Sequence, residues 1–172
     1  NLMYGGEPII DLLNEPDFDF VKGDIRNEAD VRKAMEGIDC VAHLAAIVGD
    51  PACAKHPELA RSTNLEGSQL LYSVANETGV KKFVFASTCS NYGKMEDPNQ
   101  FVTEESKLAP VSLYAETKVA VEQFLMSQSK GNACKPTCLR FSTVYGLSLR
   151  PRFDLTVNEF AKELALGREL VI

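Results

Sequence analysis

The sequence predicts an α/β fold built on a doubly wound parallel sheet. Strand-like and helix-like stretches alternate along the chain, two of the strand-like runs are apolar at nearly every position, and glycines close the helical stretches. Alternation of this kind gives parallel strands joined by right-handed helical crossovers. In such sheets, ligands bind at the carboxyl ends of the strands.

Five stretches have the composition of strands. The runs at 39–46 and 81–88 are unbroken and apolar, which is typical of strands covered on both faces. The five stretches are "FDFVKGD" at 18–24, "DCVAHLAA" at 39–46, "KKFVFAST" at 81–88, "KPTCLRF" at 135–141 and "ELVI" at 169–172.

Four stretches have helical periodicity with start and stop signals. Pro57 lies near the start of the second helix, and Ser112 is the expected N-cap of the third. The segment "VGDPACAKHPE" at 48–58 reads as an inserted loop near a ligand site. The helical stretches are 27–37, 56–79, 112–129 and 153–167.

The ends of the sequence indicate one domain that belongs to a longer chain. The 172 residues are 45% hydrophobic, which is enough for one globular core. There is no initiator Met, "NLMYGG" reads as a loop, and "ELVI" stops within a strand. We therefore expect further protein on both sides.

Composition argues against several classes of partner. A net charge of −6 and a pI near 5.0, with basic residues scattered, disfavour binding to nucleic acid or to an anionic membrane. The sequence contains no apolar run long enough to span a membrane and no signal-peptide pattern at its start. The five cysteines form no disulfide or zinc pattern, so we expect free thiols in the cytoplasm and no metal site.

A tyrosine and a lysine four residues apart, Tyr114 and Lys118, form a candidate proton-transfer pair. A phenol has a pKa of about 10, and its use as a base near neutral pH requires lowering that pKa by about three units, or about 4 kcal/mol. A lysine at i+4 and the helix N-terminus both favour the phenolate. The alternative is an ordinary pair on a solvated helix face.

Hydroxyls and small side chains follow the two apolar strands. Ser87, Thr88 and Ser90 come at the end of the 81–88 run, where they could orient a substrate hydroxyl or merely satisfy backbone groups in a turn. "HLAA" at 43–46 offers small residues that let a flat ligand approach the backbone. We interpret its histidine, His43, as a core residue.

Taken together, these motifs resemble the extended short-chain dehydrogenase/reductases, and within them the NAD-dependent epimerase/dehydratase family of nucleotide-sugar enzymes. The resemblance covers nearly the whole chain and keeps the family's order. The matching motifs are "NL" at 1–2, "GDIR" at 23–26, "HLAA" at 43–46, "NLEGSQLL" at 64–71, "FVFASTCSNYG" at 83–93, "YAETK" at 114–118 and "LRFSTVYG" at 139–146.

The resemblance implies a role for each matching residue. Tyr114 would be the general base and acid, Lys118 would hold the nicotinamide ribose and lower the tyrosine pKa, and Thr88 would bond the reacting hydroxyl. The residues implied for NAD binding are Asn1, Asp24, Ile25, Leu44, Ala45, Ala46, Asn64, Ser87, Tyr114, Lys118 and Phe141. Those implied for substrate binding are Thr88, Ser90, Thr143, Arg152 and Asn158, with Arg150 as a further contact for the diphosphate.

The resemblance also implies what is missing. The family's glycine-rich phosphate loop is absent, so we expect a Rossmann-like sheet without its first βα unit and weak NAD binding by these 172 residues alone. Residues 1–150 would be a partial NAD-binding domain, and 151–172 the start of a substrate-binding region. NAD is favoured over NADP because residues 1–6 contain no arginine for a 2′-phosphate.

The reaction implied is epimerisation of a nucleotide-diphosphate sugar through a transient ketone, at C4. Dehydratases of the family carry an Asp-Glu pair after the Ser/Thr, where this sequence has Cys89 and Ser90. Alternatives are a sugar ketoreductase, a dehydratase, or a non-catalytic dinucleotide-binding module. The resemblance further implies a homodimer through helices 57–78 and 112–129.

Overall fold

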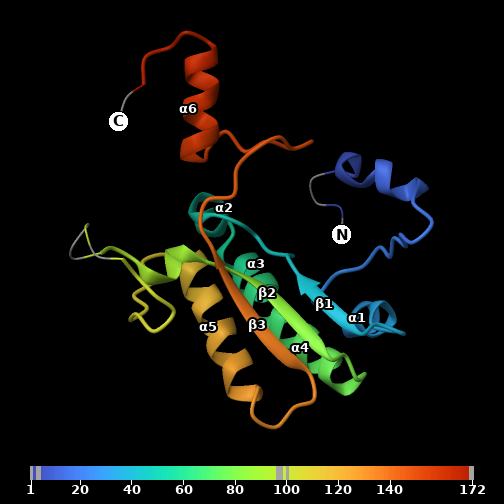
Figure 1. The fold of residues 1–172 in the computed structure, drawn as a ribbon. Coiled ribbons are helices and arrows are strands. Elements are labelled where there is room, and N and C mark those ends of the chain that lie inside the picture. Colours follow the sequence, from blue (N-terminus) through green and yellow to red (C-terminus); the bar gives the residue numbers. More distant parts are fainter. Residues whose placement is uncertain (1, 3–4, 96–98, 100, 171–172) are drawn as a thin grey trace. The chain divides into compact units, whose positions relative to one another are not determined.

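The computed structural model describes residues 2, 5–95, 99 and 101–170. The chain divides into two compact units (Figure 1). The sheet unit comprises residues 23–142. The terminal unit comprises residues 1–22 together with 143–172. The predicted domain boundary at residue 150 stays a prediction.

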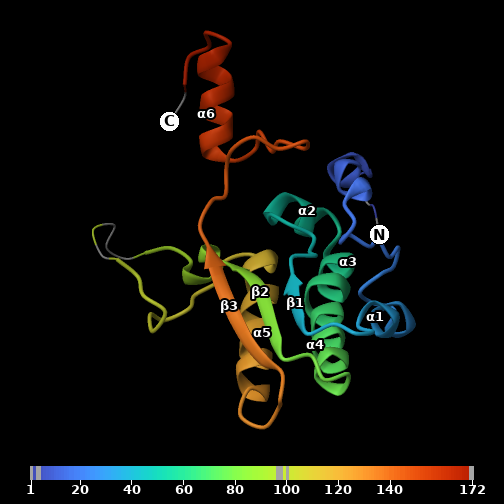
Figure 2. The same cartoon turned by 45° about the vertical axis from the view of Figure 1, so that its right-hand side comes forward.

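The sheet unit contains three parallel strands in the order β1-β2-β3 (Figures 1 and 2). They are β1 (Cys40–His43), β2 (Lys82–Thr88) and β3 (Lys135–Phe141). His43 pairs in register with Phe85, and Thr88 pairs with Phe141, so all three strands end at the same edge. The parallel α/β fold and these three strands confirm the sequence prediction.

Of two further strand predictions, that for 18–24 is wrong, and that for 169–172 is not borne out in its described half. Residues 18–24 and residues 169–170 have irregular backbone, and the last two positions of the predicted 169–172 strand lie outside the described residues. A strand needs a neighbour to satisfy its N–H and C=O groups. Among the described residues, the sheet is limited to β1, β2 and β3, and it gives neither segment such a neighbour.

Helices connect the strands as predicted, with shorter bounds. The helix predicted over 112–129 is α5 (Leu113–Gln128), and the Ser112 side chain caps it by accepting from the backbone N–H of Ala115. The expected loop at 48–58 is wrong, because it contains a helical turn started by a proline. The remaining elements are α1 (Glu28–Ala34), α2 (Asp50–Lys55), α3 (Pro57–Arg61), η3 (Ser62–Glu66), α4 (Gly67–Glu77), η4 (Cys89–Tyr92), and, in the terminal unit, η1 (Glu7–Ile9), η2 (Asp11–Asn14) and α6 (Thr156–Ala165).

The helix predicted over 56–79 is interrupted. Between α3 and α4 the backbone widens into the π-helical turn η3. Such turns interrupt the regular i to i−4 ladder and are frequent at functional sites. Asn64, at the centre of η3, is almost fully buried.

The core of the sheet unit lies between the sheet and the helices α4 and α5. Phe83 and Phe85 alternate along β2 toward this layer and are fully buried. Tyr72 of α4 contacts the rings of Phe83 and of Phe124 in α5 edge-on, with centroids 5.3 and 6.0 Å apart. This layer fixes both helices against the middle strand.

The opposite face of the sheet is partly exposed. Val84, Leu139 and Phe141 point away from α4 and α5, and the last two are 39% and 43% exposed. The expectation of a strand covered on both faces is wrong for 39–46, where Ala42 is exposed, whereas in 81–88 the outward-facing Val84 and Ala86 are half-buried. An apolar sequence predicts that a strand is buried, but it does not show which part of the protein covers each face of the strand.

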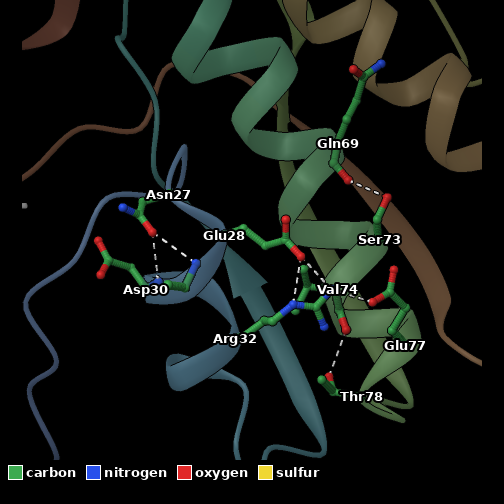
Figure 3. Close-up of polar contacts among 10 residues, drawn as sticks. Asn27, Glu28, Asp30, Arg32, Gln69, Ser73, Val74, Glu77 and Thr78 are labelled. Carbon is green, nitrogen blue, oxygen red and sulfur yellow. Dashed lines mark hydrogen bonds and ion pairs between the residues drawn. The ribbon is translucent and has the colours of Figure 1, made fainter.

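An ion-pair bridge joins α1 to α4 at the surface (Figure 3). Asn27 caps α1, and Arg32 within this helix pairs with Glu28 one turn earlier and with Glu77 of α4 at 2.7 Å. These side chains are exposed to solvent, so the bridge adds little to stability. Burial of Val31 beneath it contributes more.

Among the described residues, no helix combines the length and apolar character needed to cross a bilayer. In the same part of the chain, no group of three or more His, Cys, Asp or Glu side chains is placed to hold a metal ion.

Gly93 closes η4 and lets the chain turn back toward α5. Its φ is +69°, and a Cβ there would lie 1.9 Å from the carbonyl oxygen of Ala109. Only glycine tolerates both the backbone conformation and this approach. Gly93 therefore holds the 109–112 segment, and with it the start of α5, close to the end of β2.

We predict that Gly93→Ala lowers the free energy of unfolding by more than about 2 kcal/mol, because it combines a strained φ with a backbone collision. Gly131→Ala is the matched control, since a Cβ at Gly131 meets no atom within 4 Å. Urea unfolding of both variants measures the difference. Equal stability of the two variants would contradict this account of the turn.

Candidate active site

Lys118 lies inside the protein, at the carboxyl end of the sheet. It is only 3% exposed, and its Nζ donates to the backbone oxygen of Ala86 in β2 at 2.7 Å. The same Nζ lies 4.5 Å from the ring centroid of Phe85 and 5.8 Å from that of Tyr114. The alternative of a solvated helix face is therefore excluded for Lys118.

Burial changes the protonation of this amine. Removal from water disfavours the ammonium form and lowers the pKa of Lys118 from 10.5 to about 8, opposed weakly by the Cys53 thiol. An anion that approaches Nζ would reverse part of that cost. A phenolate on Tyr114, one helical turn earlier, is such an anion.

Tyr114 is half-buried in the first turn of α5. Its ring packs against a small apolar cluster that includes Ile47, Cys53 and Ala60. This packing brings the tyrosine next to the chain that leaves β1. The helix start and the ends of β1 and β2 thus converge on one region.

The predicted hydroxyls lie at the end of β2. Thr88 is its last residue, and its Oγ1 caps η4 by accepting from the backbone N–H of Ser90 at 3.2 Å. Ser87 is buried and accepts from Nδ2 of Asn91 at 3.0 Å. Ser90 itself is exposed. The Thr88 hydroxyl therefore accepts a hydrogen bond from the turn that follows β2, and it still carries a proton that it can donate to a ligand.

The segment that follows β1, residues 44–46, is accessible to solvent. Leu44 is 69% exposed, Ala45 is exposed, and Ala46 is half-buried. The small alanine side chains leave the backbone open to a flat ligand. This geometry fits the NAD contact that the resemblance implies for these residues.

His43 is a core residue, as interpreted from the sequence. It is buried, packs against Phe85, and lies 2.8 Å through Nε2 from Oγ of Ser68. Burial lowers its pKa to about 4, and the Lys118 charge adds to that effect. Ser68 gives its only proton to the carbonyl of Asn64 at 2.6 Å, so Nε2 of neutral His43 is the donor to Ser68.

Asn64 holds the exit of β1 in place. Its Oδ1 accepts from the backbone N–H of Ile47 at 2.7 Å, and its Nδ2 donates to the Ile47 carbonyl at 2.9 Å. These two bonds give Asn64 the tertiary role that its poor helix propensity suggested. A direct contact between Asn64 and NAD stays a prediction, while support of the 44–47 ribbon is what the hydrogen bonds show.

Asp24 and Ile25 precede α1. The carboxylate of Asp24 pairs with the Arg26 guanidinium at 2.7 Å, and its backbone N–H donates to the Asp30 carboxylate at 2.9 Å. Ile25 packs against Gly67, where an added Cβ would come within 3.0 Å of it. The adenine contacts implied for Asp24 and Ile25 stay predictions.

Several predicted residues lie outside the sheet unit. Thr143, Arg152 and Asn158 belong to the terminal unit, where Nδ2 of Asn158 donates to the Arg152 carbonyl at 3.0 Å and Arg152 pairs with Asp154. Their contacts with substrate stay predictions, as does that of Arg150. Asn1 lies outside the described residues. Phe141, which ends β3, is partly exposed opposite Thr88.

Three polar residues escaped the sequence prediction: Asn91 and Glu122, which are buried, and Arg140, which is half-buried. Glu122 could have been found, because it lies four residues after Lys118 and eight after Tyr114, on the same helix face. A carboxylate in line with a buried lysine is a specific signal. Asn91 and Arg140 could not be connected to it without the sheet register.

The described geometry forms a candidate active site at the carboxyl edge of a parallel α/β sheet. An accessible segment after β1, the buried Lys118 amine near Tyr114, and the hydroxyls of Ser87 and Thr88 at the end of β2 lie at one edge of the sheet. Sequence comparison makes this specific. The pattern of the NAD dependent epimerase/dehydratase family matches residues 7–171, so the chain belongs to this family.

Individual relatives agree with the family. The chain is 33% identical over 162 residues to the "Uncharacterized UDP-glucose epimerase YtcB" of Bacillus subtilis, covering 94% of this chain and 49% of that protein. It is 34% identical to the UDP-glucose 4-epimerase of Lactobacillus helveticus, covering 78% of this chain and 41% of the relative. The chain thus spans about half the length of the relatives that it matches.

Solved structures give the same result. The UDP-glucuronic acid 4-epimerase of Bacillus cereus in complex with NAD is similar with a TM-score of 0.81 and 30% identity, covering 95% of this chain and 50% of that one. A UDP-N-acetylglucosamine 4-epimerase from Methanobrevibacter ruminantium M1 has a TM-score of 0.87 at 26% identity, covering all of this chain and 55% of that one.

We predict that Lys118→Met raises the free energy of unfolding at pH 7 by up to about 3 kcal/mol, because it removes a buried ammonium. The depressed pKa of Lys118 means that the unfolded chain binds one more proton between pH 8 and 10.5. Wild-type stability therefore rises through that window relative to the variant, and the advantage of Lys118→Met disappears.

Chemical denaturation of both proteins from pH 7 to 10.5 measures this difference. Lys130→Met is the control, since Lys130 is exposed and its replacement should give no comparable trend. If Lys118→Met is less stable than wild type at every pH, burial of the Lys118 ammonium does not destabilise the folded protein, and this account is contradicted.

Proposed function

We propose that the protein is an NAD-dependent epimerase that inverts a hydroxyl-bearing carbon, C4, of a nucleotide-diphosphate sugar through a transient ketone. The observation that carries the proposal is the buried Lys118 amine, hydrogen-bonded to β2 and 5.8 Å from the ring of Tyr114. The names of the relatives, UDP-glucose and UDP-glucuronic acid 4-epimerases, support the substrate class. Since the chain spans about half of those proteins, the activity is proposed for the whole protein.

The protein groups supply acid–base chemistry and orientation. Tyr114, as phenolate, takes the proton from the sugar hydroxyl and later returns it, while the Lys118 ammonium stabilises the negative charge. Thr88 donates a hydrogen bond that orients the same hydroxyl. NAD, when bound, supplies the acceptor and then the donor of the hydride.

The residues proposed to hold NAD fit its two ends. Leu44, Ala45 and Ala46 offer an accessible ribbon after β1, and Lys118 offers an ammonium for the nicotinamide ribose. Phe141 and Ser87 border the region where the strands end. The adenine end falls to Asp24 and Ile25.

Epimerisation is preferred to dehydration because of the two residues that follow Thr88. Cys89 and Ser90 are exposed at the start of η4. Neither is a carboxylic acid that could protonate a leaving hydroxyl while a partner removes a carbon-bound proton. A ketoreductase would share every other residue of the site.

We further propose a cytoplasmic homodimer that pairs through α3–α4 and α5. All five cysteines are free thiols, which suits a reducing compartment. The two helical stretches pack together through Tyr72 and Phe124, so one surface could present both. Sedimentation of the whole protein tests the dimer.

We predict that Tyr114→Phe lowers kcat for the interconversion of the two sugar epimers at least about 1,000-fold, because the proton acceptor is lost. Binding of NAD should change little. Chromatography of UDP-glucose or UDP-glucuronic acid incubated with the protein follows the reaction. Tyr145→Phe, at an exposed tyrosine, is the control and should retain activity.

The same assay separates the other candidates. Epimers that interconvert with hydride retained and no net use of added NADH indicate the epimerase. Stoichiometric consumption of NADH indicates a ketoreductase, and tight NAD binding without turnover indicates a non-catalytic module. Undiminished turnover by Tyr114→Phe would rule out the proposed mechanism.

A further inference from the structure

An ion pair between the buried Glu122 and the half-buried Arg140 lies next to the candidate site, and the proposed mechanism does not use it. Glu122 of α5 is 4% exposed, and Arg140 of β3 donates to both of its carboxylate oxygens, with the shortest distance 2.7 Å from Nη2 to Oε2. The interaction holds the carboxylate in a bidentate geometry. The pair ties α5 directly to the strand β3.

Each partner also reaches a third element. Nη1 of Arg140 donates to the hydroxyl of Tyr92 in η4 at 2.9 Å and to the backbone oxygen of Glu104 at 3.1 Å. Oε1 of Glu122 accepts from Nδ2 of Asn91, also in η4, at 2.9 Å. The pair therefore joins α5, β3 and η4 in one network.

The network leads to the hydroxyls of the site. Nδ2 of Asn91 donates its second hydrogen bond to Oγ of Ser87 at 3.0 Å. The carboxylate of Glu122 fixes the orientation of this amide, because turning the amide would place Oδ1 against a negative charge. In this orientation Oδ1 of Asn91 is buried without a hydrogen-bond partner among the described residues. Ser87 is thereby held as an acceptor toward Asn91, with its own proton directed elsewhere.

Two polar side chains attach the same face of α5 to the sheet. Tyr114, Lys118 and Glu122 are spaced by four residues and lie along one side of the helix. Lys118 bonds to β2 through the Ala86 carbonyl, and Glu122 bonds to β3 and η4. Two polar anchors on one line fix both the translation and the rotation of the helix on the sheet.

We propose that Glu122 and Arg140, together with Asn91, form a positioning pair that sets the register of α5 on the sheet and so the placement of Tyr114 and Lys118 opposite Ser87 and Thr88. This inference rests on the proposed function for its catalytic consequence. Stability alone does not require such a pair, because a buried ion pair is often no more stabilising than apolar residues of the same volume.

The test uses Glu122→Gln, which keeps the shape of the side chain and removes its charge. In the wild-type protein, Lys118 should titrate near 8, as followed by NMR of ¹³C-labelled lysine, with the signal assigned by its loss in Lys118→Met. In Glu122→Gln we expect the Lys118 pKa to rise toward its ordinary value by about one unit or more, because the amine moves toward water.

The direction of the change in the Lys118 pKa distinguishes movement of α5 from simple loss of the Glu122 charge. Loss of a nearby carboxylate without movement can only lower the pKa of Lys118 or leave it unchanged. In the whole protein, the same variant should lower kcat about 10- to 100-fold with little change in KM, and should shift the acidic limb of the kcat–pH profile. Glu28→Gln, which breaks the exposed ion pair of α1 (Figure 3), is the control and should alter neither readout.

An unchanged or lowered Lys118 pKa would overturn the proposal whatever the Tm, and a lower Tm beside it would leave the pair a purely structural contact. The lysine titration needs no substrate, so absence of epimerisation in wild type would count against the proposed function and not against positioning. If Glu122→Gln does not fold, Tyr92→Phe removes only the hydroxyl that accepts from Arg140. The Tyr92→Phe variant should also raise the Lys118 pKa. If the Lys118 pKa does not rise in that variant, the proposal is overturned.

Discussion

The burial of one ammonium group organises the candidate site. Lys118 stands in the interior of the sheet unit, bonded to a strand carbonyl and stacked over an aromatic ring. Such a group is costly to keep charged away from water, and the cost is reduced when a negative charge comes close. Tyr114 lies one turn earlier, and in the proposed mechanism its phenolate supplies that charge, so the cost of burying the Lys118 ammonium favours ionisation of the tyrosine.

The surrounding structure maintains this arrangement from three directions. Asn64, in a π-helical turn, holds the chain after β1 by bonding both backbone groups of Ile47. Gly93 allows a close approach that brings the start of α5 to the end of β2. The Glu122–Arg140 pair anchors the other end of the same helix face. A site of this type therefore depends on loops and strand ends as much as on Tyr114 and Lys118, the two residues proposed to perform the chemistry.

The sequence predicted those structural features of the candidate site that depend on residues close together in the chain. Tyr114 and Lys118 share a helix face that their spacing defines, Ser112 is a recognisable cap, and the strands β1 and β2 lie in the two largely apolar runs. The prediction failed where the outcome depends on distant partners. Residues 18–24 have strand composition but no neighbouring strand in the described sheet, and the network around Arg140 depends on a register that joins residues far apart in the chain. The π-helical turn at Asn64 likewise reflects a tertiary bond that helix propensity does not contain.

Membership of the NAD dependent epimerase/dehydratase family and similarity to sugar epimerases agree with the geometry, yet the central claim concerns a single proton. The most direct test is an NMR titration of Tyr114 in the ¹³C-tyrosine-labelled protein with NAD⁺ present, assigned by comparison with Tyr114→Phe. The account predicts that Tyr114 ionises near neutral pH, about three units below an ordinary phenol, and that Lys118→Met abolishes much of this change. Ionisation of Tyr114 near pH 10 in both proteins would contradict it.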